Sequence, residues 1–303
     1  MIELHTVGRR VAGRVGATEW NLRRRIRASG GRLPADVPHP DWMNSVLKTR
    51  RQVDEAIREV DRCGLLRHPD PAKNWDSLAA VRTILGQTTT GARVLEMGAR
   101  LYSVMLPWLY QYGYRHLIGI DLVYDEPICR GPIRYEFGDL TRTRFPDGSF
   151  DVVCAMSVIE HGVEPRAYFA EAARLLAPGG LLLTSTDYWK ERVDAGGQIA
   201  YGQPITIFTI DEIAAMLQTA REYGFRLLRD VDLVCEEPAV TWERYGLEYT
   251  FVCFALVRHP TPTSPPGPRA DLRSALAGAT PNDRTTLADI PRSAERCESD
   301  GAR

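Results

Sequence analysis

The run Arg93-Val-Leu-Glu-Met-Gly98 constrains the fold of this chain more than any other feature. It is an apolar strand that ends in a carboxylate and a glycine, and a helical pattern follows it. A second apolar run ends at Asp121, 23 positions after Gly98, and a third acid, Asp139, follows 18 positions later. In a doubly wound sheet such strand ends converge on one crevice, which binds a nucleoside-containing ligand. The spacing therefore predicts an α/β fold with a crevice of this kind.

The acids at the ends of the first two strands indicate which ligand the crevice takes. A dinucleotide site aims glycines and a helix N-terminus at a pyrophosphate, and Glu96 would repel that group. S-adenosyl-L-methionine carries no phosphate, and its α-amine, sulfonium and ribose diol all suit carboxylates. A dinucleotide-dependent oxidoreductase would also require Gly-x-Gly-x-x-Gly, whereas positions 98, 100 and 103 are Gly, Arg and Ser. The sequence thus favours S-adenosyl-L-methionine as the cofactor.

Composition and charge exclude several classes of protein. The 303 residues carry a net charge of −1, with a pI of about 6.6, whereas nucleic-acid-binding domains are usually basic. The six cysteines form no Cys-x-x-Cys pair, and no His/Cys/Asp cluster has metal-ligand spacing. The N-terminus lacks a signal-peptide pattern, and no apolar stretch approaches 18 residues. We expect a cytoplasmic protein without a metal, a transmembrane segment or a nucleic-acid partner, and the oligomeric state stays open.

The chain divides into three regions by composition. Residues 1–88 combine an arginine-rich arm with an N-terminal helical cap, in which we expect helices over 44–65 and 75–85. The arginines could contact phosphate or an anionic membrane surface, or simply form a solvated helix. Residues 89–258 form the cofactor-binding domain. Residues 259–303 are rich in proline and poor in large apolar side chains, which predicts a disordered tail.

Strand and helix patterns alternate through the cofactor-binding domain, which predicts a mainly parallel sheet with helices on both faces. Helices are expected near 101–112, 165–177 and 211–223. The seven expected strands cover 93–97, 116–121, 133–137, 150–155, 180–186, 226–234 and 249–257.

Six motifs in this order resemble the class I S-adenosylmethionine-dependent methyltransferases, in particular the type 11-like branch that acts on small molecules and saccharides. They are Val94-Leu-Glu-Met-Gly98, Gly119-Ile-Asp121, Phe137-Gly-Asp-Leu140, Phe145-Pro-Asp-Gly-Ser-Phe-Asp-Val-Val153, Ser157-Val-Ile-Glu-His161 and Glu171-Ala-Ala-Arg-Leu-Leu-Ala-Pro-Gly-Gly180. The resemblance implies a Rossmann-like, seven-stranded sheet of order 3-2-1-4-5-7-6, with the last strand antiparallel. It also implies methyl transfer to an oxygen or nitrogen of a small or saccharide-type acceptor.

The same resemblance implies roles for individual residues toward the cofactor. Asp121 would accept hydrogen bonds from the ribose hydroxyls, and Asp139 one from the adenine amine. One departure is Arg100, at a position where the family usually has a small residue; it could meet the cofactor carboxylate. The full set implied to contact the cofactor is Glu96 and Gly98 at the methionine end, Arg100, Asp121, Leu122, Asp139, Leu140 beside the adenine, and Met156 along the methionine chain.

Two residues are candidates for a catalytic base. His161 ends the fourth-strand motif and Asp187 ends the fifth strand, and either could take a proton from a hydroxyl acceptor. The alternative for His161 is ordering of its loop, and for Asp187 it is support of neighbouring groups. Beyond Asp187, the aromatic residues Tyr188, Trp189 and Tyr201 suit a sugar ring, although such residues often only pack. A non-catalytic or regulatory protein that retains the methyltransferase fold is the alternative function.

Overall fold

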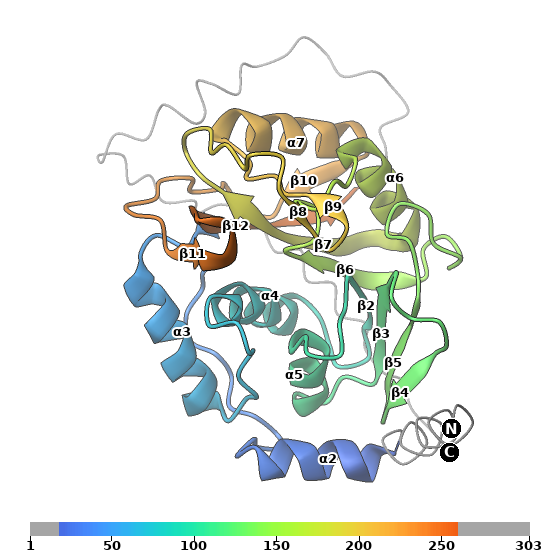
Figure 1. Cartoon of the computed structure of the whole chain (residues 1–303). Helices are drawn as coiled ribbons and strands as arrows, with labels where there is room; N and C mark the ends of the chain where they lie inside the picture. The colour runs from blue at the N-terminus through green and yellow to red at the C-terminus, as the bar shows by residue number, and fades with distance from the viewer. Residues whose placement is uncertain (1–17, 260–303) are drawn as a thin grey trace, which may run out of the picture. The chain divides into compact units, whose positions relative to one another are not determined.

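The computed structural model describes residues 18–259 (Figure 1), so residues 1–17 of the arginine-rich arm and nearly all of the expected tail lie outside the described residues. Within this part of the chain, no helix has the length and apolar character needed to cross a membrane. The helices are α2 (Glu19–Ala28), α3 (Arg50–Cys63), α4 (Lys73–Gln87), α5 (Met105–Gln111), α6 (Pro165–Leu175), α7 (Ile210–Glu222) and the 3-10 turn Glu243–Tyr245. The strands are β1 (Ser45–Val46), β2 (Arg93–Met97), β3 (His116–Asp121), β4 (Ile128–Arg130), β5 (Ile133–Phe137), β6 (Phe150–Met156), β7 (Leu176–Tyr188), β8 (Ile199–Ala200), β9 (Gln203–Pro204), β10 (Phe225–Leu227), β11 (Val240–Trp242) and β12 (Leu247–Arg258).

One twisted sheet organises the described residues (Figure 1). Its parallel part runs β5-β3-β2-β6-β7, and β12 then pairs antiparallel with β7. Strand β10 also pairs antiparallel with β12, on the edge of β12 that faces away from β7. The seven expected strands are therefore present, and the short strands β1, β4 and β11 bring the sheet to ten. This doubly wound arrangement gathers the carboxyl ends of β2, β3, β5, β6 and β7 at one edge.

The strands are buried on both faces, because helices cover the sheet from both sides. Alternate residues of β2 show this: Val94 packs in a core with α3, α4 and α5, while Leu95 packs in a second core with α6 and α7. Leu182 and Leu183 of β7 divide in the same way. Successive side chains of a strand therefore enter the two cores in turn. Because both faces are buried, the sequences of these strands are nearly continuous apolar runs.

The N-terminal segment differs from the expected helix over 44–65, which begins only at Arg50. Residues 45–46 instead form β1 and pair with β12, and the Leu47 amide donates to the Phe251 carbonyl at 2.8 Å. The expected strand 226–234 is likewise shorter, ending at Leu227. Beyond it the chain turns toward the N-terminal segment, where Asp232 donates its amide to the Asn44 carbonyl at 3.0 Å. Both corrections have one cause: the open edge of β12 and its neighbours supply hydrogen bonds that local periodicity does not reveal.

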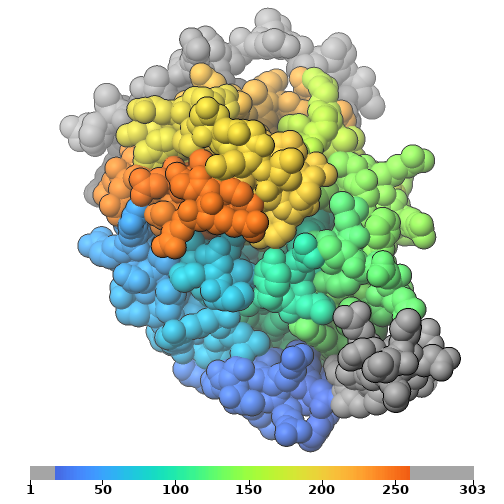
Figure 2. Space-filling model, in the orientation of Figure 1, coloured from blue at the N-terminus to red at the C-terminus, as the bar shows by residue number. Residues whose placement is uncertain are grey.

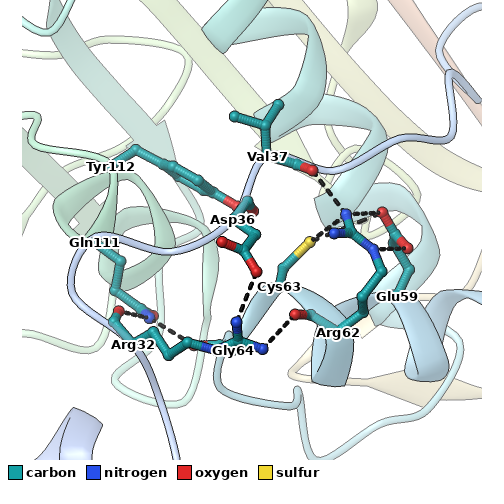
Figure 3. Close-up of polar contacts among 9 residues, drawn as sticks. All are labelled: Arg32, Asp36, Val37, Glu59, Arg62, Cys63, Gly64, Gln111 and Tyr112. Carbon is teal, nitrogen blue, oxygen red and sulfur yellow. Dashed lines mark hydrogen bonds and ion pairs between the residues drawn. The ribbon is translucent and has the colours of Figure 1, made fainter.

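The segment before α3 is fastened to α5 and to the end of α3 by polar contacts (Figure 3). The side-chain amide of Gln111 donates to the carbonyls of Arg32 and Gly64 at 2.8 and 2.9 Å, and the Tyr112 hydroxyl donates to the Asp36 carbonyl at 2.6 Å. Arg32 also pairs with Asp36 at 2.6 Å. Backbone carbonyls of this segment thus receive hydrogen bonds from side chains, and the N-terminal helices are held as a layer against the sheet.

Candidate functional site

Glu96 lies at the end of β2 and is almost completely buried, at 4% exposure. The backbone of Leu106, in the first turn of α5, hydrogen-bonds to its carboxylate. Its other oxygen, Oε2, has no hydrogen-bond partner among residues 18–259. Burial, with a further contribution from the charge of Asp76, raises the pKa of Glu96 to about 8. A buried carboxylate with an unused oxygen is a ready acceptor for a cationic or donor group of a ligand.

Gly98 follows β2 in the left-handed region, with φ of +74°. A Cβ atom there would also lie 2.4 Å from Cγ2 of Val158, in the loop after β6. Position 98 therefore requires glycine for two reasons. The same contact shows that the loops after β2 and β6 meet at the edge of the sheet.

Asp121 ends β3 and is held by two neighbours. Its Oδ1 accepts a hydrogen bond from the Val123 amide at 3.0 Å, and its Oδ2 pairs with Nε of Arg100 at 3.2 Å. In this structure Arg100 thus neutralises Asp121, a contact that the sequence reasoning did not consider. Leu122, the next residue, is 63% exposed at the rim.

Asp139 and Leu140 follow β5, and Met156 ends β6. Oδ1 of Asp139 accepts hydrogen bonds from the amide and the hydroxyl of Thr141 at 2.8 and 2.7 Å. Leu140 and Met156 are half-buried. All eight residues implied to contact the cofactor therefore lie in β2, β3 or β6 at their carboxyl ends or in the loops that follow β2, β3 and β5.

A second group of acids lies further along the same edge. We call Asp76, Glu160 and Asp187 the acidic cluster; their exposures are 0%, 1% and 2%. Each carboxylate is held by a hydroxyl group distant in sequence or on a neighbouring strand. Asp76 accepts from Ser185 at 2.7 Å, Glu160 accepts from Thr186 at 3.0 Å, and Asp187 hydrogen-bonds to Tyr249.

Lys73 is the cation among these acids. Burial lowers the pKa of its ammonium, but the charges of Asp76, Glu160 and Asp187 outweigh burial, so the net shift is upward. Within residues 18–259 the ammonium forms no ion pair, and it lies 4.1 Å from the centre of the Phe251 ring. Lys73 therefore stays charged, and the carboxylates surround it without direct pairing.

Burial acts in the opposite direction on the carboxyl groups. It raises the pKa of Glu160 to about 7 and that of Asp187 well above its usual range, and the proximity of these two acids adds to the shift of Asp187. It also raises the pKa of Asp76. Lys73 opposes all three shifts. The acidic cluster can therefore hold and release protons near neutral pH.

His161 lies beside the acidic cluster but in a different electrostatic state. Burial, assisted by the charge of Lys73, lowers the pKa of its imidazole to about 4, so the ring is neutral at pH 7. The ring packs edge-on against Tyr201, with 5.1 Å between centroids, and Nδ1 has no partner in the described part of the chain. His161 can accept a hydrogen bond, but it is a weak base.

The segment between β7 and α7 contacts the backbone of the acidic cluster. The amide of Thr206 donates to the Glu160 carbonyl and that of Phe208 to the Asp187 carbonyl, both at 3.0 Å. Figure 2 shows this segment beside the chain around residue 245, and the Tyr245 hydroxyl donates to the Ile199 carbonyl at 3.0 Å. Of the aromatic residues expected to face an acceptor, Tyr201 is 67% exposed, whereas Tyr188 belongs to the core.

The sequence reasoning did not identify Asp76, Lys73, Glu160 or Tyr249 as site residues. Asp76 and Lys73 come from the first turn of α4, ahead of the alternating region. A signal was present, because the run Pro71–Asp76 also looks similar to methyltransferases, and Glu160 precedes His161 in its motif. Among residues 18–259, no three His, Cys, Asp or Glu side chains are arranged to hold a metal ion.

Comparisons with known proteins add to this geometry. Residues 57–229 match a family described as "Methyltransferase domain". Phosphoethanolamine N-methyltransferase 1 of Zea mays is 26% identical over 143 residues, which cover 45% of this chain and 28% of that protein. A "Probable S-adenosylmethionine-dependent methyltransferase" of Mycolicibacterium smegmatis is 38% identical over 78 residues, covering 24% of this chain and 30% of that protein. The chain thus spans less than a third of the length of these curated relatives.

Among solved structures, an S-adenosylmethionine-dependent methyltransferase of Mesorhizobium loti is similar. Its TM-score is 0.43 at 19% identity, with 62% of this chain and 98% of that chain covered.

Proposed function

Because this chain belongs to the methyltransferase-domain family, which covers residues 57–229, we propose that it transfers the methyl group of S-adenosyl-L-methionine to a small-molecule acceptor. The observation that carries the proposal is Glu96, a buried carboxylate at the end of β2 whose Oε2 lacks a partner in the described residues. The cofactor has two positive groups and no phosphate, which suits this acid. When bound, it supplies an activated methyl group.

We propose that the cofactor lies along the ends of β2, β3 and β5. Glu96 and Gly98 hold the methionine end, and Asp121 holds the ribose hydroxyls through charge-assisted hydrogen bonds. Asp139 accepts from the adenine amine, with Leu140 and Leu122 beside the ring and Met156 along the methionine chain. The Asp121 carboxylate binds both the Arg100 guanidinium and the ribose hydroxyls.

We propose that the acceptor binds at the acidic cluster, beneath the segment between β7 and α7. Three buried carboxylates around one ammonium disfavour an anionic acceptor and suit a polar molecule that carries hydroxyl or amine groups, such as a saccharide. The exposed ring of Tyr201 could pack against such a molecule. Transfer goes to the acceptor oxygen or nitrogen.

The acceptor proton has two possible destinations among our proposed catalytic residues. Asp187 has a raised pKa and a carboxyl neighbour in Glu160, so the pair can take a proton at neutral pH. His161, with a pKa of about 4, takes one less readily. S-adenosyl-L-methionine held by Glu96 and Asp121 would supply the methyl group, and the acceptor proton would move to the Asp187–Glu160 carboxylate pair. Beyond proton removal, the protein needs to hold the acceptor atom in line with the methyl group.

Calorimetric titration with S-adenosylhomocysteine, with NAD as the competing ligand class, tests the cofactor. We expect micromolar binding of S-adenosylhomocysteine only. Asp121→Ala should weaken it at least about tenfold, because a charge-assisted hydrogen bond contributes about 1.5–3 kcal/mol. Asp125→Ala, which removes an exposed acid of the next loop, is the matched control. Wild-type affinity in a folded Asp121→Ala variant would remove Asp121 from the site, and absence of binding to the wild type would favour the non-catalytic alternative.

A further inference from the structure

Asp76 comes from α4 and yet reaches the edge of the sheet where β2 and β6 end. Its carboxylate is fully buried and accepts hydrogen bonds from the hydroxyls of Ser185 at 2.7 Å and Ser157 at 3.4 Å. Ser157 directly follows β6, the strand that pairs with β2 so that Cys154 lies opposite Glu96. Asp76 is therefore placed beside the end of the strand that carries Glu96.

The two carboxylates are close enough to influence each other, since the charge of Asp76 raises the pKa of Glu96. Two buried acids of like charge are costly unless a cation lies between them. Arg100 pairs with Asp121, and the charge of Lys73 stabilises the Asp76 carboxylate, but within residues 18–259 no ion pair joins Lys73 to Asp76 or to Glu96. Oε2 of Glu96, on a side chain that is 4% exposed, is left without a partner in the same part of the chain.

We propose that Asp76 and Glu96 together bind the α-ammonium group of S-adenosyl-L-methionine. The inference rests on the proposed function and extends it to a residue outside the alternating strands and helices. An ammonium group has three N–H donors. The unused Oε2 of Glu96 can accept one of them, and so can Oδ1 of Asp76, which otherwise accepts a 3.3 Å hydrogen bond from the Ser77 hydroxyl. The hydroxyls of Ser157 and Ser185 hold Asp76 in place. The N-terminal helical layer thereby becomes part of the cofactor site.

Two ligands that differ only at the amino-acid end test this assignment. The full chain is titrated calorimetrically with S-adenosylhomocysteine and with 5′-methylthioadenosine, which keeps the nucleoside and lacks the ammonium group. Asp76→Asn preserves the shape of the side chain and removes its charge. We expect it to weaken S-adenosylhomocysteine at least about tenfold and to leave 5′-methylthioadenosine within about twofold.

Glu59→Gln is the matched control, because the Glu59 side chain is also largely buried but pairs with Arg62 within α3 and accepts a hydrogen bond from the His39 amide. It should leave both affinities unchanged. If Asp76→Asn does not fold, Glu96→Gln with the same two ligands tests the subsite. The inference would be overturned if Asp76→Asn bound S-adenosylhomocysteine as tightly as the wild type, or if its affinity for both ligands fell by the same factor. Either result would leave the proposed function intact. Failure of the wild type to bind either ligand would overturn the proposed function and this inference with it.

Discussion

The acids at the edge of the sheet fall into two groups with different environments. Asp121 and Asp139, after β3 and β5, are anchored by donors two residues further on, the amides of Val123 and Thr141. The acids at β2, β6 and β7, with Asp76 of α4, are buried and depend on partners far away in the sequence. Asp76 and Ser185, for example, are 109 positions apart.

This difference separates two kinds of chemistry. The carboxylate oxygens of Asp121 and Asp139 suit hydrogen bonds from neutral hydroxyl and amine groups. Burial raises the pKa of Glu96 and Glu160, so these groups can exchange protons near neutral pH, and a cation that binds beside them favours their ionised form. We propose that the half of the edge at β3 and β5 recognises the nucleoside, and that the half at β2, β6 and β7 binds charged groups and exchanges protons.

The largest expected effect concerns proton transfer in the buried half. With an acceptor identified by transfer of radiolabelled methyl groups, Asp187→Asn should lower kcat roughly 10²–10⁴-fold if the acceptor is a hydroxyl. His161→Gln should cost less, because its low pKa makes it a weak base. The wild-type rate should rise with pH as the acidic cluster ionises, near the pKa of about 7 of Glu160. S-adenosylhomocysteine affinity is the control and should stay within about twofold. Full rates in both variants across pH 5–9 would show that neither residue moves a proton and that positioning alone supports transfer.

A smaller effect should appear in stability. The folded protein keeps a proton on Glu96 up to about pH 8, whereas the unfolded chain loses it near 4.5. The free energy of unfolding should therefore fall as pH rises through this range, by up to about 1.4 kcal/mol per pH unit from this group. Urea unfolding at pH 5, 6.5 and 8 should show a shallower fall for Glu96→Gln. Asp121→Asn, at the end of β3, should retain the wild-type slope. A shallower slope in Asp121→Asn than in Glu96→Gln would contradict the division of the edge.

The smallest effect concerns Arg100. Its ion pair with Asp121 is partly exposed, and such pairs contribute about 0.2–1 kcal/mol. Arg100→Met should free Asp121 and tighten S-adenosylhomocysteine by up to about fivefold in calorimetry. Arg134→Met, which removes the arginine partner of Glu136 on β5, is the control. Weaker binding in Arg100→Met would instead show that Arg100 contacts the cofactor, as the sequence reasoning suggested.

Local sequence patterns were sufficient to predict the parallel strands and the positions of Asp121 at the end of β3 and Asp139 just after β5. The bounds expected for β2, β3 and β5 equal those observed, because a short apolar run bounded by turns leaves little choice of register. Asp121 and Asp139 could be named as candidates because Asp121 ends such a strand and Asp139 lies two residues after one. The same reasoning failed for residues 45–46, which look helical and pair with β12, since an open strand edge supplies hydrogen bonds that outweigh local preference.

The sequence by itself therefore determined the class of fold, the family and the row of acids at the ends of the parallel strands. Only the tertiary structure decided which of those acids are buried and what surrounds them. Lys73 and Asp76 enter the site from a helix that precedes the first parallel strand, and Tyr249 enters from the last strand. Burial and long-range charge set the pKa of each group, and neither property can be read from neighbours in sequence, because both depend on which segments the fold brings together.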